Sequence, residues 1–305
     1  MIAIFNNLVP VFALMVVGHV MGRLKFVEKS FFTNADRVVY FIFFPVMLFW
    51  KIGGTNSAEL INWALTGTVL GLLTGAWLLS LAWARFTKMP ANQVGAFSQC
   101  CYRFNTYVGL AVVLSALGEK GVTEFGILIS VIIPYLNVLA VSTLIWFSQQ
   151  QYSGREKFML LLKAMLANPL ILGCLAGLAY SLFKTPFPAF FDNTFRLLSV
   201  AALPLALMSI GNSLSFDMVR GYLKPALVAT VIRQAVLPLA GYLVLRFLNL
   251  DHLPYKTAML FLAMPTSTSA YILSGLLGSD PRLASACIVL STMLSFVSLS
   301  VVILI

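Results

Sequence analysis

Long apolar runs separated by short polar segments make up almost the whole of this chain. A helix needs about 20 predominantly apolar residues to cross a hydrocarbon core about 30 Å thick. Runs of about this length recur from the first residues to the last, and no connecting segment is long enough to form a soluble domain. The sequence therefore predicts ten spans, at residues 4–22, 34–53, 61–84, 93–117, 122–148, 158–183, 193–213, 222–247, 255–277 and 282–305.

Composition agrees with an integral membrane protein. Of the 305 residues, 60% are hydrophobic and 10% are charged, whereas soluble domains are about 25% charged. The net charge of +10 does not indicate nucleic-acid binding, because the basic residues lie in short loops between apolar spans. The first span has no basic segment before it and no small-residue cleavage site, so we expect it to remain as an anchor.

The distribution of Lys and Arg between alternate loops predicts the orientation. With the spans placed as above, one set of loops holds twelve of these residues and the other holds six. Cytoplasmic loops carry the excess, so the first set is predicted to be cytoplasmic and both termini to lie outside. The twelve are Arg23, Lys25, Lys29, Arg37, Arg85, Lys88, Arg155, Lys157, Lys163, Arg220, Lys224 and Arg282; the six are Lys51, Lys120, Lys184, Arg196, Arg246 and Lys256.

An internal repeat relates the two halves of the chain. A shift of 159 residues aligns prolines, glycines and asparagines of the first half with identical residues of the second. After one inserted residue, a shift of 160 continues the alignment. Each unit holds five spans, an odd number, so the second copy is expected to be inverted in the membrane, as in many transporters. The matched pairs include Pro10 with Pro169, Pro45 with Pro204, Asn105 with Pro265, and Gly118 with Gly278.

The acidic residues and cysteines argue against catalysis in the membrane. All ten Asp and Glu residues fall in predicted loops or at span ends, whereas proton relays and aspartyl proteases need carboxylates at mid-depth. The chain has no HExxH motif for a zinc protease. Its four cysteines lie inside apolar spans without metal-ligand spacing. We expect no enzyme activity, no cofactor and no metal.

Two apolar spans carry polar residues and helix interrupters at mid-depth. The fourth contains Arg103, Asn105, Thr106 and Gly109. Asn and Thr are good helix N-caps, and Gly permits unwinding or close backbone approach. A helix that restarts here would point free N–H groups at the midplane, which favours an anion. Two such interruptions at matching places are the usual pointer to a transporter's substrate site.

The ninth span supplies the second interruption. Pro265 lacks an N–H, and hydroxyl side chains follow it, including Thr266, Ser267 and Ser269. An ordinary proline kink with hydroxyls bonded to the preceding turn is the alternative. The matching interruption in the fourth span favours a true break.

Three further polar residues within spans leave alternatives open. Burial of a cation normally marks a function or a specific partner. Arg103 is therefore either an anion anchor or a structural donor to carbonyls freed by the break. For Arg233 in the eighth span the structural interpretation is the stronger. Asn137, which follows Pro134 in the fifth span, either lines the same cavity or bonds a neighbouring helix.

Three segments together resemble bacterial members of the auxin efflux carrier family. RFNTYVGL (103–110) is similar to the family's fourth-span motif, PLALMSIGNSL (204–214) to its seventh span, and AMPTSTSAYILSGLLGSDPRLASACIVLST (263–292) to its ninth and tenth. The resemblance covers nearly the whole chain. One departure is that Leu110 and Ala111 stand where many members have a proline soon after the fourth-span glycine.

The resemblance implies an all-α membrane protein of ten helices in two inverted five-helix repeats, with broken helices four and nine crossing. It implies scaffold helices at 1–58 and 151–216, which would also form a homodimer contact. Transport helices would occupy 59–150 and 217–305. A bacterial inner-membrane location and carriage of organic anions follow from the same resemblance.

The function we predict is secondary transport of a small carboxylate by an elevator or rocking motion, in the direction of export. The predicted substrate-binding residues are Arg103, Asn105, Thr106, Gly109, Asn137, Pro265, Thr266, Ser267 and Ser269. A sodium- or proton-coupled importer on the same fold is the alternative, since carbonyls, Asn and Thr can bind sodium. A membrane sensor or assembly subunit is a second alternative.

Overall fold

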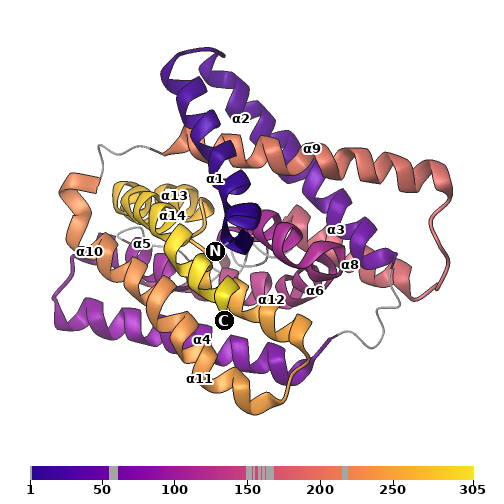
Figure 1. Cartoon of the computed structure of the whole chain (residues 1–305). Helices are drawn as coiled ribbons and strands as arrows, with labels where there is room; N and C mark the ends of the chain where they lie inside the picture. Colours follow the sequence, from indigo (N-terminus) through magenta and orange to yellow (C-terminus); the bar gives the residue numbers. More distant parts are fainter. Residues whose placement is uncertain are drawn as a thin grey trace.

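The computed structural model describes residues 2–54, 61–148, 153, 155–156, 159, 162, 168–214 and 219–305. All regular secondary structure in these residues is helical, and the helices pack into one body (Figure 1). Five helical stretches among the described residues are long and apolar enough to cross a membrane, by length and composition. These are Trp63–Phe86, Ala91–Phe147, Ala189–Ser213, Val219–Leu248 and Pro281–Leu304.

The first half of the chain forms helices at each of its five predicted spans. Several of these spans are divided into shorter helices by turns or breaks. The elements are α1 (Ile2–Arg23), α2 (Lys29–Val38), a π-helical turn (Val39–Phe43), α3 (Phe44–Gly53), α4 (Trp63–Phe86), α5 (Ala91–Tyr102) and α6 (Thr106–Phe147).

The second half is helical at its predicted spans as well. Only the later part of the sixth predicted span is described as a continuous helix, because most of residues 158–167 lie outside the described residues. The elements are α8 (Pro169–Ser181), α9 (Ala189–Ser213), α10 (Val219–Val231), a π-helical turn (Ile232–Val236), α11 (Leu237–Leu245), a 3₁₀ turn (Arg246–Leu248), α12 (His252–Ala263), α13 (Ser269–Leu276) and α14 (Pro281–Leu304).

A π-helical turn precedes a proline in both halves. The N–H of Leu237 donates to the carbonyl of Ile232, five residues earlier, and Pro238 follows. The N–H of Phe44 likewise donates to the carbonyl of Val39, and Pro45 follows. A proline cannot donate to the helix ladder, and π-turns of this kind are common at functional sites. The extra residue in the second turn turns Arg233 and Gln234 both into the protein.

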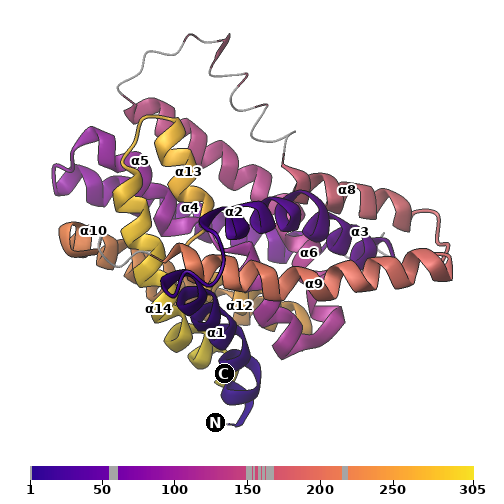
Figure 2. The same cartoon turned by 90° about the horizontal axis from the view of Figure 1, so that it is seen from above.

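The helices pack in two groups with α6 between them. In the first group α1 packs on α9 and α3 on α8, and α9 also contacts α2 and α3. In the second, α4 and α6 pack on α5, α12 on α6, and α14 on α10 and α13. Figure 2 shows α3, α8 and α9 on one side and α4, α5, α10 and α13 on the other. The predicted group boundaries near residues 58, 150 and 216 all lie outside the described residues.

Two glycines that the repeat matches have the same unusual backbone. Gly118 has φ +69° and Gly278 has φ +71°. A side chain is strained at such angles, so glycine is the residue that suits both places. Gly118 divides α6 into two straight parts, and Gly278 lies between α13 and α14.

All four cysteines of the chain are buried and none forms a disulfide. Two of them, Cys100 and Cys101, lie on α5, and Cys287 lies on α14. Burial among apolar side chains agrees with the packing role that their positions within spans predict.

Candidate functional site

The fourth and ninth spans are both broken at the predicted places. In the fourth, α5 ends at Tyr102 and α6 begins at Thr106. In the ninth, α12 ends at Ala263 and α13 begins at Ser269. The intervening segments, residues 103–105 and 264–268, lie in contact with each other, and we call these two segments and their contact the crossing.

Several hydrogen bonds join the two broken spans, and three of them involve residues of the crossing. The backbone N–H of Asn105 donates to the carbonyl of Pro265 at 2.8 Å. The Thr266 hydroxyl donates to the carbonyl of Cys100 at 2.8 Å. Arg103 Nη2 donates to Ser269 Oγ at 3.0 Å. Backbone groups that helix interruption leaves unpaired in one span are therefore satisfied by the other, as a membrane core requires.

Asn105 is the N-cap of the restarted helix. Its Oδ1 accepts hydrogen bonds from the N–H groups of Tyr107 at 3.0 Å and Val108 at 3.3 Å. The sequence predicted this capping role. It also predicted that the N–H groups of this helix terminus would be free to face a ligand, whereas the asparagine side chain occupies two of them.

The unpartnered donors at the crossing belong to side chains. Among the described residues, Arg103 Nη1 and Asn105 Nδ2 are buried without a hydrogen-bond partner. Arg103 is 8% exposed and Asn105 is 2% exposed. A buried donor without an acceptor costs free energy, about 1–3 kcal/mol and more when it is charged. These groups are therefore able to bind an acceptor that enters from outside the protein.

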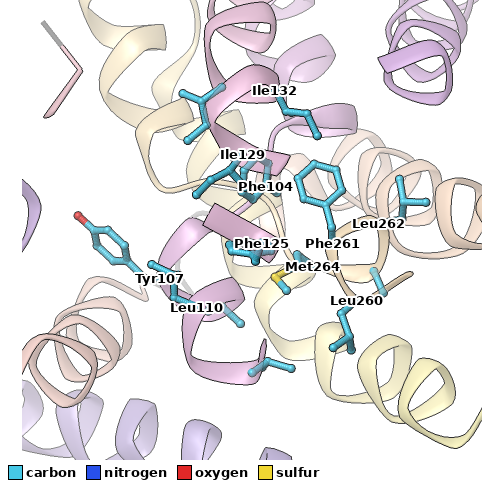
Figure 3. Packing of buried hydrophobic residues seen from close by; sticks show 14 of the residues in the cluster. Phe104, Tyr107, Leu110, Phe125, Ile129, Ile132, Leu260, Phe261, Leu262 and Met264 are labelled. Carbon is cyan, nitrogen blue, oxygen red and sulfur yellow. The ribbon is translucent and has the colours of Figure 1, made fainter. Parts of the chain in front are cut away.

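Aromatic side chains pack around Phe104, the middle residue of the break in the fourth span. Phe104 packs against Phe125 and Phe261, with ring centroids 6.2 Å and 4.5 Å away, and those two rings also contact each other (Figure 3). Gly109 packs beside this cluster. A Cβ at position 109 would lie 2.6 Å from Phe125 Cζ and 2.8 Å from Met264 Sδ. Of the two roles that the sequence left open for Gly109, close approach is the one this packing supports.

Replacing Gly109 by alanine is expected to destabilise the protein and slow its transport. The added methyl group overpacks the contact between α6 and Met264, which corresponds to about 1–3 kcal/mol. Thermal unfolding in detergent measures the change. Gly71→Ala is the matched control, because no atom lies within 4 Å of a Cβ built there. Equal unfolding temperatures for the two variants would contradict the packing role.

Arg233 is a structural donor at the crossing, which is the interpretation that the sequence favoured for it. Its side chain is fully buried and donates three hydrogen bonds, to the carbonyls of Arg103 at 3.2 Å, Leu262 at 2.6 Å and Phe261 at 2.8 Å. The partners lie far away in the sequence. The one local signal was the presence of an arginine inside an apolar span, where an unpartnered charge is expensive.

Asp36 is an acidic residue that lies beside the restarted helix of the fourth span. It is half-buried in α2 and lies near the side chains of Ser209 on α9 and Tyr107 on α6. Tyr107 belongs to the first turn of the restarted helix. The sequence showed this residue only as an acid near the start of the second span.

The remaining predicted site residues lie at different distances from these contacts. Ser267 Oγ lies 2.8 Å from Ser269 Oγ, and the N–H of Thr266 donates to Ser291 Oγ at 3.1 Å. Thr106 is the first residue of α6. Asn137 is buried in the part of α6 that follows Gly118. No group of three or more His, Cys, Asp or Glu side chains in the described part of the chain could hold a metal ion.

Comparison with known proteins agrees with this architecture. The family described as "Membrane transport protein" matches residues 3–159 and 154–303. An uncharacterized transporter of Methanothermobacter thermautotrophicus is 23% identical over 298 residues, 96% of this chain and 95% of its own length. A protein of Rhizobium meliloti that carries the provisional name of a malonate transporter is 23% identical over 313 residues, 97% of this chain and 93% of its own.

A third relative, an uncharacterized transporter of Methanocaldococcus jannaschii, is 24% identical over 292 residues, 93% of each chain. The family match extends over almost the whole sequence, and the alignments cover at least 93% of each relative. Together with the apolar helices, these matches indicate a multi-pass transporter and not an enzyme. The chain belongs to the auxin efflux carrier family of membrane transport proteins.

Proposed function

We propose that this protein transports a small organic anion that carries at least one carboxylate, and that the anion binds at the crossing. Arg103 and Asn105 would bind its oxygens, and Ser269 would share in that contact. Thr106, Gly109, Pro265, Thr266 and Ser267 would frame the site, and Asn137 would line the approach to it.

One observation carries the proposal: Arg103 and Asn105, beside Ser269 and Pro265, each keep a buried donor without a partner. Arg103 Nη1 and Asn105 Nδ2 are buried and unpaired, while the Pro265 and Cys100 carbonyls already accept hydrogen bonds. A carboxylate offers acceptors alone, and an arginine binds it through short, charge-assisted hydrogen bonds. The provisional malonate-transporter name of the Rhizobium relative agrees with this substrate class.

Burial of the site argues for alternating access. Asn105 and Thr266 are at most 2% exposed, so a solute reaches them only when packed helices separate. The group of α1, α2, α3, α8 and α9 would serve as a scaffold, corresponding to residues 1–58 and 151–216. The group of α4–α6 and α10–α14, within 59–150 and 217–305, would slide or rock against it.

An inverted repeat would explain the symmetry of the two breaks. Its support is the pair of positive-φ glycines, Gly118 and Gly278, and the broken spans at matching positions. The two termini lie close together in both views (Figures 1 and 2), which agrees with an even number of spans and with both ends outside a bacterial inner membrane. A homodimer would form through the scaffold helices.

Energetics favour export. Moving one negative charge outward across an inside-negative membrane releases about 2.3 kcal/mol per 100 mV. This corresponds to a gradient of about fiftyfold at 1.4 kcal/mol per tenfold change. An anion exporter therefore operates without a coupling ion.

A proton-coupled importer is a second candidate, and the position of Asp36 favours it. Its carboxylate lies near the side chains of Tyr107 on α6 and Ser209 on α9, so it lies between the two proposed groups. Protonation would remove its negative charge and change how the groups hold together. In this candidate Asp36→Asn would abolish dependence on a pH gradient.

Reconstitution into liposomes tests the proposed function. Purified protein should carry radiolabelled mono- and dicarboxylates when a membrane potential drives the anion. Adding a sodium gradient or a pH gradient should not increase the rate. Stimulation by a pH gradient that Asp36→Asn removes would identify the importer instead. Failure of every carboxylate to move in vesicles that hold folded protein would contradict the proposal and favour a sensor or assembly subunit.

A further inference from the structure

Arg233 is bound to the ends of both broken helices at once. Phe261 and Leu262 belong to the last turn of α12, and Arg103 follows the last residue of α5. The carbonyls of a helix's last turn have no partner within the helix and carry roughly half a negative elementary charge together. Two such termini meet at the crossing, and the Arg233 guanidinium lies against both.

Other backbone carbonyls around the crossing are also occupied by donors of the protein, whereas the side-chain oxygens Gln99 Oε1 and Gln234 Oε1 are buried without a partner. Ala263 accepts from the Ser298 hydroxyl at 2.9 Å. Pro265 accepts from the Asn105 N–H and Cys100 from the Thr266 hydroxyl. A small monovalent cation at the crossing would need such oxygens as its ligands. Arg233 takes three of them and already supplies the positive charge.

The backbone around Arg233 is built to hold it there. The π-helical turn Ile232–Val236 turns Arg233 and its neighbour Gln234 into the protein together. Gln234 Nε2 donates to the carbonyl of Ser291 at 2.6 Å, and Ser291 Oγ accepts from the N–H of Thr266. Through Arg233 the eighth span thus contacts the fourth span and the end of α12. Through Gln234 it contacts Ser291, which in turn contacts the break in the ninth span.

We propose that Arg233 is a resident cation of the crossing: its guanidinium holds the α5 and α12 ends together in the place a free coupling cation would need. It is a positioning residue, because Arg103, not Arg233, keeps an unpaired donor. Removing its side chain exposes three carbonyls and leaves a cavity that a small cation fits. The variant therefore acquires a cation dependence that the native protein lacks.

Arg233→Ala tests this without any substrate. In detergent, guanidinium chloride at low millimolar concentration should raise the unfolding temperature of the variant by at least about 2 °C relative to choline chloride of equal ionic strength. The native protein and Arg246→Ala should show no such difference. Arg246 is the matched control, because it ends the same span and its exposed side chain lies over the Phe247 ring.

Transport in liposomes supplies the second measurement, and this arm alone rests on the proposed function. Arg233→Ala should be slowed about thirtyfold or more, since each lost hydrogen bond to a charged group corresponds to about tenfold or more. Guanidinium should restore transport about tenfold, and choline should not. A folded alanine variant that responds to no small cation, or that transports at the native rate, overturns the proposal, as does sodium-dependent transport by the native protein.

If the alanine variant does not fold, Arg233→Lys and Arg233→Met decide the matter. The two side chains are similar in length and differ in charge. Transport by the lysine variant, reduced but at least about tenfold faster than that of the methionine variant, supports a resident cation. Equal activity of the two variants would show that Arg233 only fills space. The native protein is measured in parallel in identical vesicles. If it transports the carboxylate there, a negative result for the Arg233 variants does not contradict the proposed function.

Discussion

Replacing Asn105 by leucine is expected to abolish transport, with a loss of at least about a hundredfold. The change removes the cap on the Tyr107 and Val108 N–H groups, which corresponds to about 0.5–2 kcal/mol of stability. It also removes the buried, unpaired Nδ2 donor. Initial rates of carboxylate uptake into liposomes measure the effect.

Asn105→Asp separates the two roles of the same side chain. An aspartate keeps an oxygen in the capping position, so the variant should unfold within a few degrees of the native protein. It exchanges the Nδ2 donor for a negative oxygen that repels a carboxylate, so transport should still be lost. A stable, fully active aspartate variant would show that position 105 acts on the helix alone and would remove it from the binding site.

Arg103→Gln is expected to raise the KM for the carboxylate about 10- to 100-fold. A hydrogen bond to a charged group contributes about 1.5–3 kcal/mol, and each 1.4 kcal/mol is a factor of ten in affinity. The maximal rate should fall less, because Arg103 anchors the carboxylate in the bound state. Concentration-dependent uptake measures both constants.

Arg196→Gln is the control for the Arg103 variant. It removes an equal charge from an exposed position on α9, where Arg196 contacts Asn193. Its kinetics should match those of the native protein. Native KM in the Arg103 variant would mean that its guanidinium is a structural donor to Ser269 and that the anion binds elsewhere.

The sequence predicted the breaks because their signals are local. A proline at 265 and an asparagine cap at 105 act within one turn of the chain. Interrupted apolar spans also have few allowed environments in a membrane. The described parts of the predicted spans are helical for the same reason, although the turns that divide the second and eighth spans at Val39–Phe43 and Ile232–Val236 carried no signal beyond a following proline.

The contacts that the sequence did not predict are long-range. Arg233 reaches the Arg103 carbonyl 130 residues away, and Asp36 contacts Ser209 from the other half of the chain. No spacing along the chain encodes such a meeting. Gly109 is an intermediate case: a glycine beside a break suggested unwinding or close approach, and only the positions of Phe125 and Met264 decide between them.

All four native cysteines are buried in the helix packing, which makes this transporter suitable for site-directed spin labelling. Labelling reagents attack the thiolate from water, so a buried thiol reacts slowly with them. A pair of spin labels on cysteines introduced at the water-exposed ends of α9 and α4 would report the separation of the two helix groups in the otherwise native chain.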